Sequence, residues 1–436
     1  MRFLNSNDKR LFKILQLKGK LYYYGYCNMS WKKVCRSLDK GQFPGTIRGQ
    51  FAFVYISGKD WVACVDHLCS TQIFYTSTKI DSHFGNLAEE SANLTENFNC
   101  FQQLEILRMH TVGPETIYNE IKRLEPETYV RNGKTYRYSD ILNEPTLKLD
   151  IDKIYYRFES ICNHHDLNNA NIMLSGGKDS GWLALLVQHL GFDPEYIHLT
   201  SPNLMNNSDP AAIKDYESEC KMKIKRVNFD FLPLSTQDIF WKNNPFEAKS
   251  LAAKTGRGQI TLSGEIGATN ASNKNGLGTI LANKTKPNPD DFVKMFVATQ
   301  HTWGKKGVQK SIHDDFFQKF YKTEAYEQIF EYFRTKIKNI DKPDNLKYHN
   351  FCILETSMHR IYHESQDYRN TWFNVFADYE IQNAFINSPW SDKQNDVPKY
   401  NLYAIGKKHF KNWTDISWRY PVVGMGIPNV GQFRKI

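Results

Sequence analysis

The sequence predicts an α/β protein with two domains, a mainly antiparallel domain over residues 1–145 and a doubly wound parallel-sheet domain with helical additions over residues 146–436. Two patterns carry this prediction. Strand-like runs crowd together in the first part of the chain without long helices between them, whereas strands alternate with amphipathic helices after residue 170. A length of 436 residues also exceeds what one compact core normally holds.

The antiparallel part is predicted from short β-rich runs that turn residues separate. Gly49–Ile56 and Trp61–Val65 are two such runs, and Ile73–Thr76 follows as a shorter one. Thr128–Val130 and Lys134–Tyr138 flank an Asn-Gly pair, which favours a tight hairpin turn. A tight turn reverses the chain, so neighbouring runs of this kind are expected to pair antiparallel.

The second part alternates between apolar strands and amphipathic helices, the order that a parallel sheet with crossover helices requires. Further along, charged stretches carry aromatic residues at helical spacing, which indicates core packing rather than a stacking platform. Strands are expected at Ile172–Leu174, Tyr196–Thr200, Lys223–Phe229 and Gln259–Leu262, and helices at Gly181–Leu190, Asp209–Met222, Asn345–Ser365, Asp378–Ile386 and Leu402–Phe410.

The stretch Ser175–Ser180 (Ser-Gly-Gly-Lys-Asp-Ser) ends the first of these strands and begins a helix. Paired glycines let a ligand approach the backbone closely, and the N–H groups at a helix start favour negative charge. The hydroxyls of Ser175 and Ser180 add donors, so the turn is typical of a phosphate site. Because Asp179 by itself repels phosphate, we expect it to hold a Mg²⁺ ion that bridges it to a nucleotide.

A second strand end carries Ser263-Gly264-Glu265, directly after Gln259–Leu262. In an open parallel sheet, ligands bind outside the carboxyl ends of the strands. Ser175 and Ser263 are therefore expected to face one crevice. The Gly-Lys-Ser/Thr ending of a Walker loop is missing, so the sequence indicates a different class of phosphate loop.

The Ser-Gly-Gly-x-Asp-Ser string resembles the pyrophosphate loop of ATP-dependent enzymes that adenylate a carbonyl oxygen, and the chain as a whole resembles the asparagine synthetase family. Gly49–Phe53 and Ile121–Pro126 look like segments of that family's glutaminase half. Ser263–Glu265, Phe376–Asp378 and Gly424–Pro428 are similar to segments of its synthetase half. The matches run in the same order over most of the chain. The N-terminal part of the chain, residues 1–145, is called the front half below. It is also similar to the front half of β-lactam and carbapenam synthetases.

The resemblance implies a glutaminase-like N-terminal domain of the Ntn type, with αββα layers, and a C-terminal ATP-pyrophosphatase domain. It implies ATP and Mg²⁺ as cofactors, Asp179 as the metal ligand, and Glu265 and Lys178 as catalytic residues, with Glu265 helping to deprotonate the attacking amine. The residues expected to contact the nucleotide are Leu174, Ser175, Gly176, Gly177, Asp179, Ser180, Leu199, Ser263 and Gly264.

The front half departs from the family at the residue that carries glutamine hydrolysis. A class II glutaminase uses an N-terminal cysteine that Met removal exposes, whereas here Arg2 follows Met1. The nearest cysteine is the internal Cys27. We therefore expect no glutaminase activity, and a structural role for this half.

The synthetase half also lacks two family residues. Ala268 stands where a second Mg²⁺-binding aspartate is expected, and Val422 stands at the lysine that stabilises the phosphate charge. Either Lys274, Lys407 or Lys408 supplies that charge from elsewhere, or the chemistry has changed or stopped.

The function predicted from these features is an ATP-dependent ligase that adenylates a carboxylate and joins it to ammonia or another amine. Its substrates are then a small-molecule carboxylate and an amine. Two alternatives stay open: a scaffold or pseudoenzyme that keeps ATP binding, and an amide-forming enzyme that modifies nucleic acid, which the net charge of +9 would suit.

The composition of the chain also limits the class of protein and its compartment. With 41% hydrophobic and 24% charged residues the chain is typical of soluble proteins, and no apolar stretch approaches the ~20 residues of a membrane-spanning helix. Residues 1–17 lack the apolar core of a secretion signal. The eight cysteines contain no Cys-x-x-Cys pair, which favours reduced thiols. A cytoplasmic protein without a membrane partner is expected, and a homodimer stays open.

Two further clusters have both a functional and an ordinary interpretation. Glu355, His359 and His363 recur on one helical face, where they would be able to ligate a metal. Lys305, Lys306 and Lys310 form a basic run that nucleic acid would attract. Packing and solvation explain both patterns more simply, so neither enters the predicted site.

Overall fold

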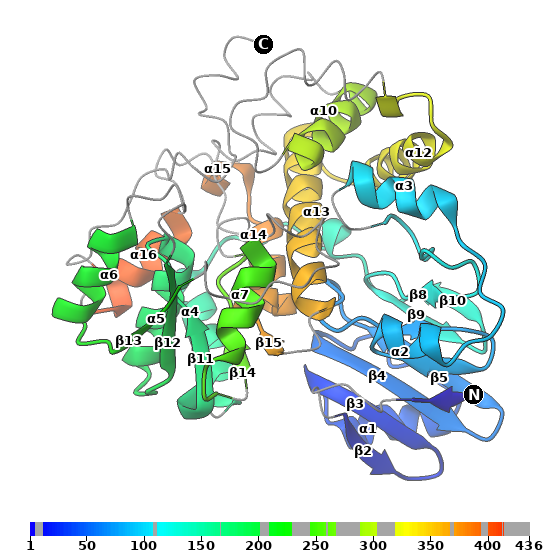
Figure 1. The fold of residues 1–436 in the computed structure, drawn as a ribbon, viewed down its shortest axis with the longest axis horizontal. Helices are drawn as coiled ribbons and strands as arrows, with labels where there is room; N and C mark the ends of the chain where they lie inside the picture. The colour runs from blue at the N-terminus through cyan, green and yellow to red at the C-terminus, as the bar shows by residue number, and fades with distance from the viewer. Residues whose placement is uncertain are drawn as a thin grey trace.

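The chain folds into three β-sheets with helices packed on them (Figure 1). The structure is a computed structural model, and it describes residues 1–4, 12–107, 111–165, 167–200, 209–228, 245–258, 260–266, 288–302, 319–366, 370–393, 400–411 and 413. In Figure 1 the sheets that residues 2–137 build lie at the lower right, and the sheet that residues 170–373 build lies at the left.

The first sheet is antiparallel, and α1 (Trp31–Asp39) covers one of its faces. Its strands are β2 (Lys13–Gln16), β3 (Lys20–Cys27), β4 (Gly49–Ser57), β5 (Asp60–Val65), β9 (Thr128–Arg131) and β10 (Lys134–Arg137). They lie in the order β10-β9-β5-β4-β3-β2. Successive side chains of a strand point to opposite faces, so Phe51 and Phe53 of β4 pack under α1 while Ala52 and Val54 pack toward the second sheet.

The second sheet packs on the other face of the first. Its strands are β1 (Arg2–Phe3), β6 (Phe74–Tyr75), β7 (Lys79–Asp81) and β8 (Lys122–Arg123). The order is β1-β7-β6-β8, and β1 pairs parallel with β7 while the other pairs are antiparallel. Ile73 and Ile80 pack toward the first sheet, and α2 (Phe84–Glu89) covers the opposite face through Leu87.

The third sheet is parallel throughout. Its strands are β11 (Ala170–Met173), β12 (Glu195–Thr200), β13 (Ile224–Asn228), β14 (Ile260–Leu262) and β15 (Thr371–Phe373), in the order β13-β12-β11-β14-β15. The chain moves outward from β11 to β13 and then returns to the other side of β11. The direction of winding therefore reverses between β11 and β14, which makes this pair the topological switch point.

Helices cover both faces of the parallel sheet, as a doubly wound fold requires. These helices are α4 (Ile151–Asn163), α5 (Lys178–His189), α6 (Asp209–Ser218), α7 (Pro245–Lys254) and α16 (Tyr400–His409). Ile172 and Leu174 point into the larger core with α4, α5, α6 and α16, whereas Met173 and Ile197 pack under α7.

One long helix, α13 (Asp344–Gln366), runs through the middle of the molecule, between the sheets of residues 2–137 and the parallel sheet (Figure 1). A single apolar core contains Ile106 from the front half together with Phe333 and Phe351 from the helical part. The remaining α-helices of the described residues are α3 (Phe98–Ile106), α10 (Pro289–Thr302), α12 (Glu324–Lys338), α14 (Tyr379–Ile386) and α15 (Trp390–Lys393).

The structure confirms the mixed α/β class, with antiparallel sheets in the first part and a parallel sheet in the second. The Asn-Gly hairpin is also confirmed, since Asn132 and Gly133 both have positive φ, as a type I′ turn needs. The helix predicted to reach Met222 ends at Ser218 because Lys221 adopts a left-handed φ of 56°. No helix within the described ranges has the length and apolarity needed to cross a bilayer.

Candidate functional site

The loop after β11 passes directly into α5. The Leu174 N–H donates to the Ile197 carbonyl at 2.8 Å, so the strand pairing continues one residue beyond β11. Gly177 is the N-cap of α5 with an extended backbone (φ −77°, ψ 149°), and no side chain caps the helix start. Asp179 lies in the first turn. A helix start without a capping side chain suits an external anion, because N–H groups and the helix dipole point at it.

Two serines hold this loop in shape. The Ser175 N–H donates to Ser180 Oγ at 3.0 Å, and the two hydroxyl oxygens lie 2.9 Å apart. The Gly177 N–H donates to Ser175 Oγ at 3.2 Å. Ser180 is buried and Ser175 is exposed. Ser180 therefore fixes the loop from inside, and Ser175 lies on its exposed side.

The end of β14 contacts the start of α5. β11 and β14 pair parallel with Ile172 opposite Leu262, so both strands end at the same edge of the sheet. A Cβ atom on Gly264 would lie 2.7 Å from Ser180 N and 2.9 Å from the Asp179 carbonyl carbon. No side chain fits in that space. The strand ends that carry Ser175 and Ser263 thus lie side by side, as the sequence predicts.

A lysine that the sequence did not single out lies at this edge. Lys249 of α7 donates to Ser263 Oγ at 3.1 Å and to Glu265 Oε1 at 2.7 Å. Its ammonium is also 4.0 Å from Glu364 Oε1 and 5.3 Å from the centre of the Trp372 ring. Lys249 is part of no motif, and only the packing of α7 against the sheet brings it to the site.

Glu364 is the second residue that sequence reasoning missed as a site residue. It lies in the last turn of α13 and is 4% exposed. Asn374, which follows β15, donates to its Oε2 at 3.5 Å. Burial raises the pKa of Glu364 to about 7; Lys249 lowers this pKa and Glu265 raises it. Burial therefore favours the protonated form of Glu364 more than that of an ordinary glutamate.

The other predicted site residues are placed as follows. Leu199 of β12 is half-buried and packs on the α7 side with Met173 and Ala252. Lys178 is the first residue of α5, and its side chain lies outside the described residues. Three lysines were alternatives for the charge missing at Val422. Lys408 forms an ion pair with Asp152, Lys407 is exposed, and Lys274 lies outside the described residues.

The charges at this edge suit a nucleotide that arrives with a divalent cation. Asp179, Glu265 and Glu364 bring three carboxyl groups, against the ammonium of Lys249. A bare triphosphate would be repelled by this surplus, whereas carboxylate and hydroxyl oxygens are the donors that Mg²⁺ prefers. Among the described residues no group of three His, Cys, Asp or Glu side chains forms a metal cage. Mg²⁺ normally binds through one or two carboxylates and the phosphates of its nucleotide, so the residues present fit it.

Several predicted positions cannot be compared with this geometry. Ala268, Val422 and Gly424–Pro428 lie outside the described residues, as does the basic run from Lys305 to Lys310. The side chains of His359 and His363 lie outside them too. The third member of that helical face, Glu355, forms a buried ion pair with Lys336.

Cys27 in the front half lies at the end of β3, opposite Gly49 of β4. Its thiol donates to the Met29 carbonyl at 3.0 Å. Burial raises its pKa to about 11, so the thiol stays protonated at neutral pH and is a poor nucleophile. All eight cysteines are free thiols.

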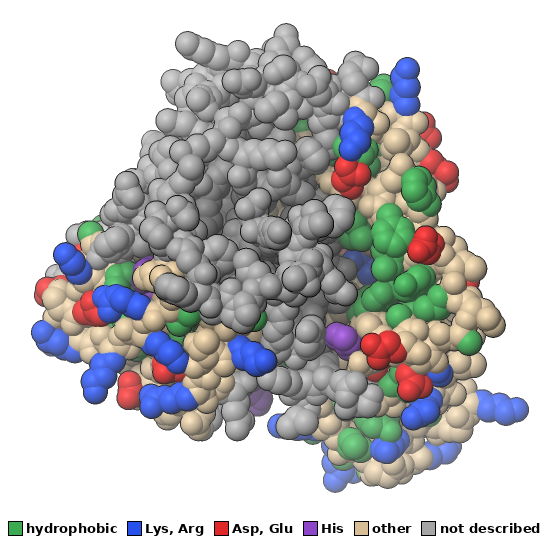
Figure 2. Space-filling view, in the orientation of Figure 1, with side chains coloured by type: hydrophobic (Ala, Val, Ile, Leu, Met, Phe, Trp, Pro, Cys, Tyr) green, Lys and Arg blue, Asp and Glu red, His purple; other side chains and the backbone are tan. Residues whose placement is uncertain are grey.

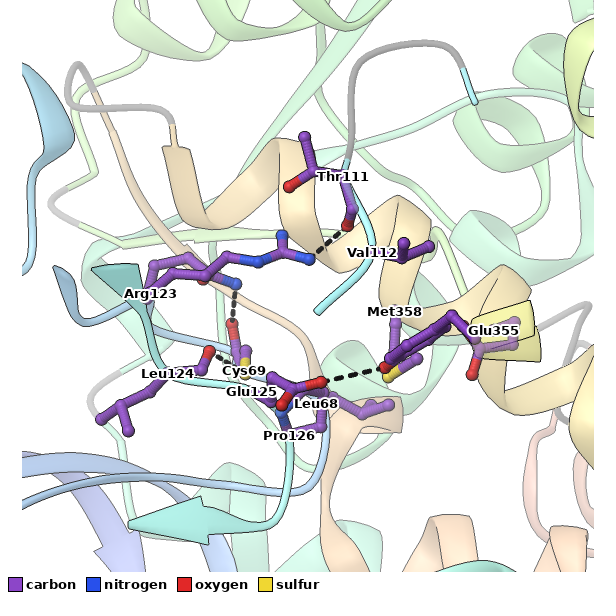
Figure 3. Close-up of a pocket in the computed structure, with 12 residues that line it drawn as sticks. Leu68, Cys69, Thr111, Val112, Arg123, Leu124, Glu125, Pro126, Glu355 and Met358 are labelled. Carbon is purple, nitrogen blue, oxygen red and sulfur yellow. Dashed lines mark hydrogen bonds between the residues drawn. The ribbon is translucent and has the colours of Figure 1, made fainter. Parts of the chain in front are cut away.

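A small cavity of about 40 Å³ lies between the front half and α13 (Figure 3). Figure 3 shows Arg123 and Glu125 on one side and Met358 and Glu355 of α13 on the other. Glu125 accepts a hydrogen bond of 3.1 Å from the Tyr332 hydroxyl. A cavity of this size holds a few water molecules and no nucleotide. Its lining contains none of the residues at the ends of β11 and β14.

The surface charge on one face of the molecule is visible in Figure 2. On that face the described Lys and Arg side chains are scattered among Asp and Glu side chains rather than gathered in a stripe. A nucleic-acid surface usually gathers its basic residues along one groove or helix. The described part of this face therefore adds no support for a nucleic-acid substrate.

Comparisons with known proteins give no family assignment. No model of a known protein family matches the chain, and a search of curated proteins found no significant match. The geometry at the ends of β11 and β14 and the motifs in the sequence are therefore the features that point to a function.

Proposed function

We propose that this chain is an ATP-dependent, asparagine-synthetase-like ligase that adenylates a carboxylate and transfers the acyl group to ammonia or another amine. One observation carries the proposal. The loop after β11 and the loop after β14 meet at the switch point of a doubly wound sheet, next to a helix start without a capping side chain. Open α/β sheets bind their ligands at this point. The predicted phosphate residues and Glu265 belong to these two loops.

Each group at the edge has a role in this proposal. The first-turn N–H groups of α5 and the Ser175 hydroxyl bind the phosphates, together with Lys178. Asp179 holds Mg²⁺, which when bound neutralises phosphate charge. Lys249 supplies the positive charge that the sequence lacks at Val422, and Glu265 holds the Lys249 ammonium in position at 2.7 Å.

The front half has a structural role in this proposal, as an Ntn-type glutaminase-like domain without the nucleophile. The order of its layers, which is α1, the first sheet, the second sheet and α2, supports this proposal. Cys27 supports this view, because burial keeps its thiol protonated and its hydrogen bond goes to a backbone carbonyl. Ammonia or an amine from solution would then be the nitrogen donor. We expect ammonia-dependent activity to survive replacement of every cysteine.

The decisive experiment is ATP–pyrophosphate exchange with a panel of amino acids, with and without oligonucleotides. Asp179→Ala is expected to reduce exchange by roughly 100-fold or more, because the metal-held phosphate charge is lost. Asp193→Ala is the matched control, since Asp193 is exposed beyond the other end of α5. This control is expected to exchange like the wild type.

The same assay separates the alternatives. Exchange that requires an oligonucleotide identifies a nucleic-acid-modifying enzyme. ATP binding in calorimetry without exchange for any carboxylate identifies a scaffold. Full exchange in Asp179→Ala would remove Asp179 from the metal site.

A further inference from the structure

Glu364 is held less firmly than the other carboxylate that Lys249 contacts. Its Oε1 lies 4.0 Å from the Lys249 ammonium, beyond hydrogen-bond reach, and is buried with no hydrogen-bond donor among the described residues. Glu265 instead accepts a bond of 2.7 Å from Lys249. A buried carboxylate without a strong partner is unstable as an anion, so it tends to take up a proton.

The groups around Glu364 also indicate that Glu364 and Glu265 have different roles. The described groups that face it are Lys249 from α7, Ser263 and Glu265 after β14, and Asn374 after β15. One ammonium stands between two carboxylates and is able to neutralise one of them fully. Glu265 forms the short ion pair with this ammonium, which leaves Glu364 as the one of these two carboxylates that can accept a proton.

We propose that Glu364, rather than Glu265, accepts the proton of the attacking amine, an inference that rests on the proposed ligase function. The amine lone pair attacks the carbonyl carbon of the acyl-adenylate and forms the C–N bond. The bond from that carbon to the phosphate oxygen breaks, and its electron pair leaves with AMP. The proton displaced from nitrogen moves to Glu364 Oε1 and then returns to solvent. Lys249 and Glu265 are positioning residues in this step.

The test compares two half-reactions in the isosteric variants Glu364→Gln and Glu265→Gln. ATP–pyrophosphate exchange with L-aspartate as the carboxylate probe reports adenylation, and AMP release with ammonium chloride reports the amine step. If aspartate is not a substrate, the exchange panel supplies the carboxylate. In Glu364→Gln we expect exchange within about twofold of wild type, and an amine-dependent rate that falls by roughly 100- to 10,000-fold.

The pH profile distinguishes proton transfer from a structural role. The wild-type amine-dependent rate is expected to fall on the acid side of pH 7, because Glu364 must be deprotonated to act. In Glu364→Gln the amine-dependent rate is expected to show no such fall below pH 7, which is called the acid limb of the profile. Glu265→Gln is expected to keep this acid limb. Ionisation of the amine contributes equally to every variant and cancels in the comparison.

Glu127→Gln is the matched control for a buried acid. Burial also raises the pKa of Glu127 to about 7, but it lies in the front half and accepts a bond from the Ile141 N–H at 2.7 Å. This variant is expected to keep the limb, and thermal melting monitors folding of all three variants. An acid limb that persists in Glu364→Gln, or equal loss of both half-reactions in a folded Glu364→Gln protein, overturns the inference. Absence of wild-type exchange with every carboxylate overturns the proposed function and this inference with it.

Discussion

Lys393 lies at the end of α15 and is 2% exposed. Its ammonium donates to Asn350 Oδ1 at 2.9 Å and to the Ile386 carbonyl, and neither acceptor carries a charge. Burial, together with the positive charge of the nearby Lys342, lowers its pKa from the usual 10.5 to about 7. A single side chain in this position makes the stability of the whole fold depend on pH.

The sign of this dependence follows from proton binding. The unfolded chain keeps this lysine protonated up to about pH 10.5, whereas the folded protein releases the proton above about pH 7. The unfolded state therefore binds more protons between these values, and stability rises with pH. For wild type we expect this group to add about 1 kcal/mol per pH unit between pH 7 and pH 9 in urea unfolding.

The variant Lys393→Met is expected to lack this rise, because methionine has no proton to release. Lys407→Met is the matched control, since Lys407 is exposed on α16. Its unfolding free energy is expected to follow the wild-type slope. Equal slopes for wild type and Lys393→Met would show that Lys393 is charged inside the fold.

At the scale of elements, the contact between the end of β14 and the start of α5 builds the proposed site. Both partners of this contact are backbone, so neither can rotate away as a side chain can. A Cβ on Gly264 would meet Ser180 N at 2.7 Å. The two loops can approach only if this residue has no side chain.

Gly264→Ala is expected to push the two elements apart. Overpacking against backbone typically lowers the free energy of unfolding by about 1–3 kcal/mol. Displacement of the loop should also lower the rate of ATP–pyrophosphate exchange, by a factor that corresponds to at least this free energy. Gly45→Ala is the matched control, because a Cβ there meets nothing within 4 Å. The control should change the unfolding free energy by less than about 0.5 kcal/mol. If Gly264→Ala matches the control in both measurements, the described contact is not what holds the site.

At the scale of the whole molecule, one buried carboxylate joins three elements that are far apart in sequence. Asp378 is fully buried and caps α14 by accepting from the Glu380 N–H at 3.0 Å. It pairs with Arg157 of α4 at 2.6 Å and accepts from the Tyr26 hydroxyl of β3 at 2.9 Å. The front sheet is therefore tied to the helices that cover the parallel sheet.

Asp378→Asn is expected to destabilise the protein by about 3–5 kcal/mol, because it leaves Arg157 without its buried partner. Tyr26→Phe removes one hydrogen bond and should cost about 1 kcal/mol. Hydrogen exchange measured by mass spectrometry should rise in both β3 and α14 in Asp378→Asn. Glu217→Gln, which breaks the exposed pair with Arg226, is the control and should change little. A rise confined to α14 would show that the two ends of the molecule are not coupled through this residue.

Much of this architecture was predictable because it depends on local patterns. β-rich runs bounded by turn residues predicted β4 and β5, and the Asn-Gly pair predicted the β9–β10 hairpin. β3 was not predicted, although its run of tyrosines is also rich in residues that favour strands. The short strand β15 was missed as well, since it forms on the sheet edge by pairing with β14.

The amino-acid order was enough to identify the strand–turn–helix around Gly176 and Gly177 and to predict that Ser263 ends a neighbouring strand, because these features depend on residues close together in the chain. The cluster of Lys249, Glu265 and Glu364 was not accessible in this way. Its members come from α7, the loop after β14 and the end of α13, and their charges interact only because these elements pack at one edge of the sheet. Burial at that edge raises the pKa of Glu364 to about 7, and burial is a property of the packed chain rather than of its sequence neighbours.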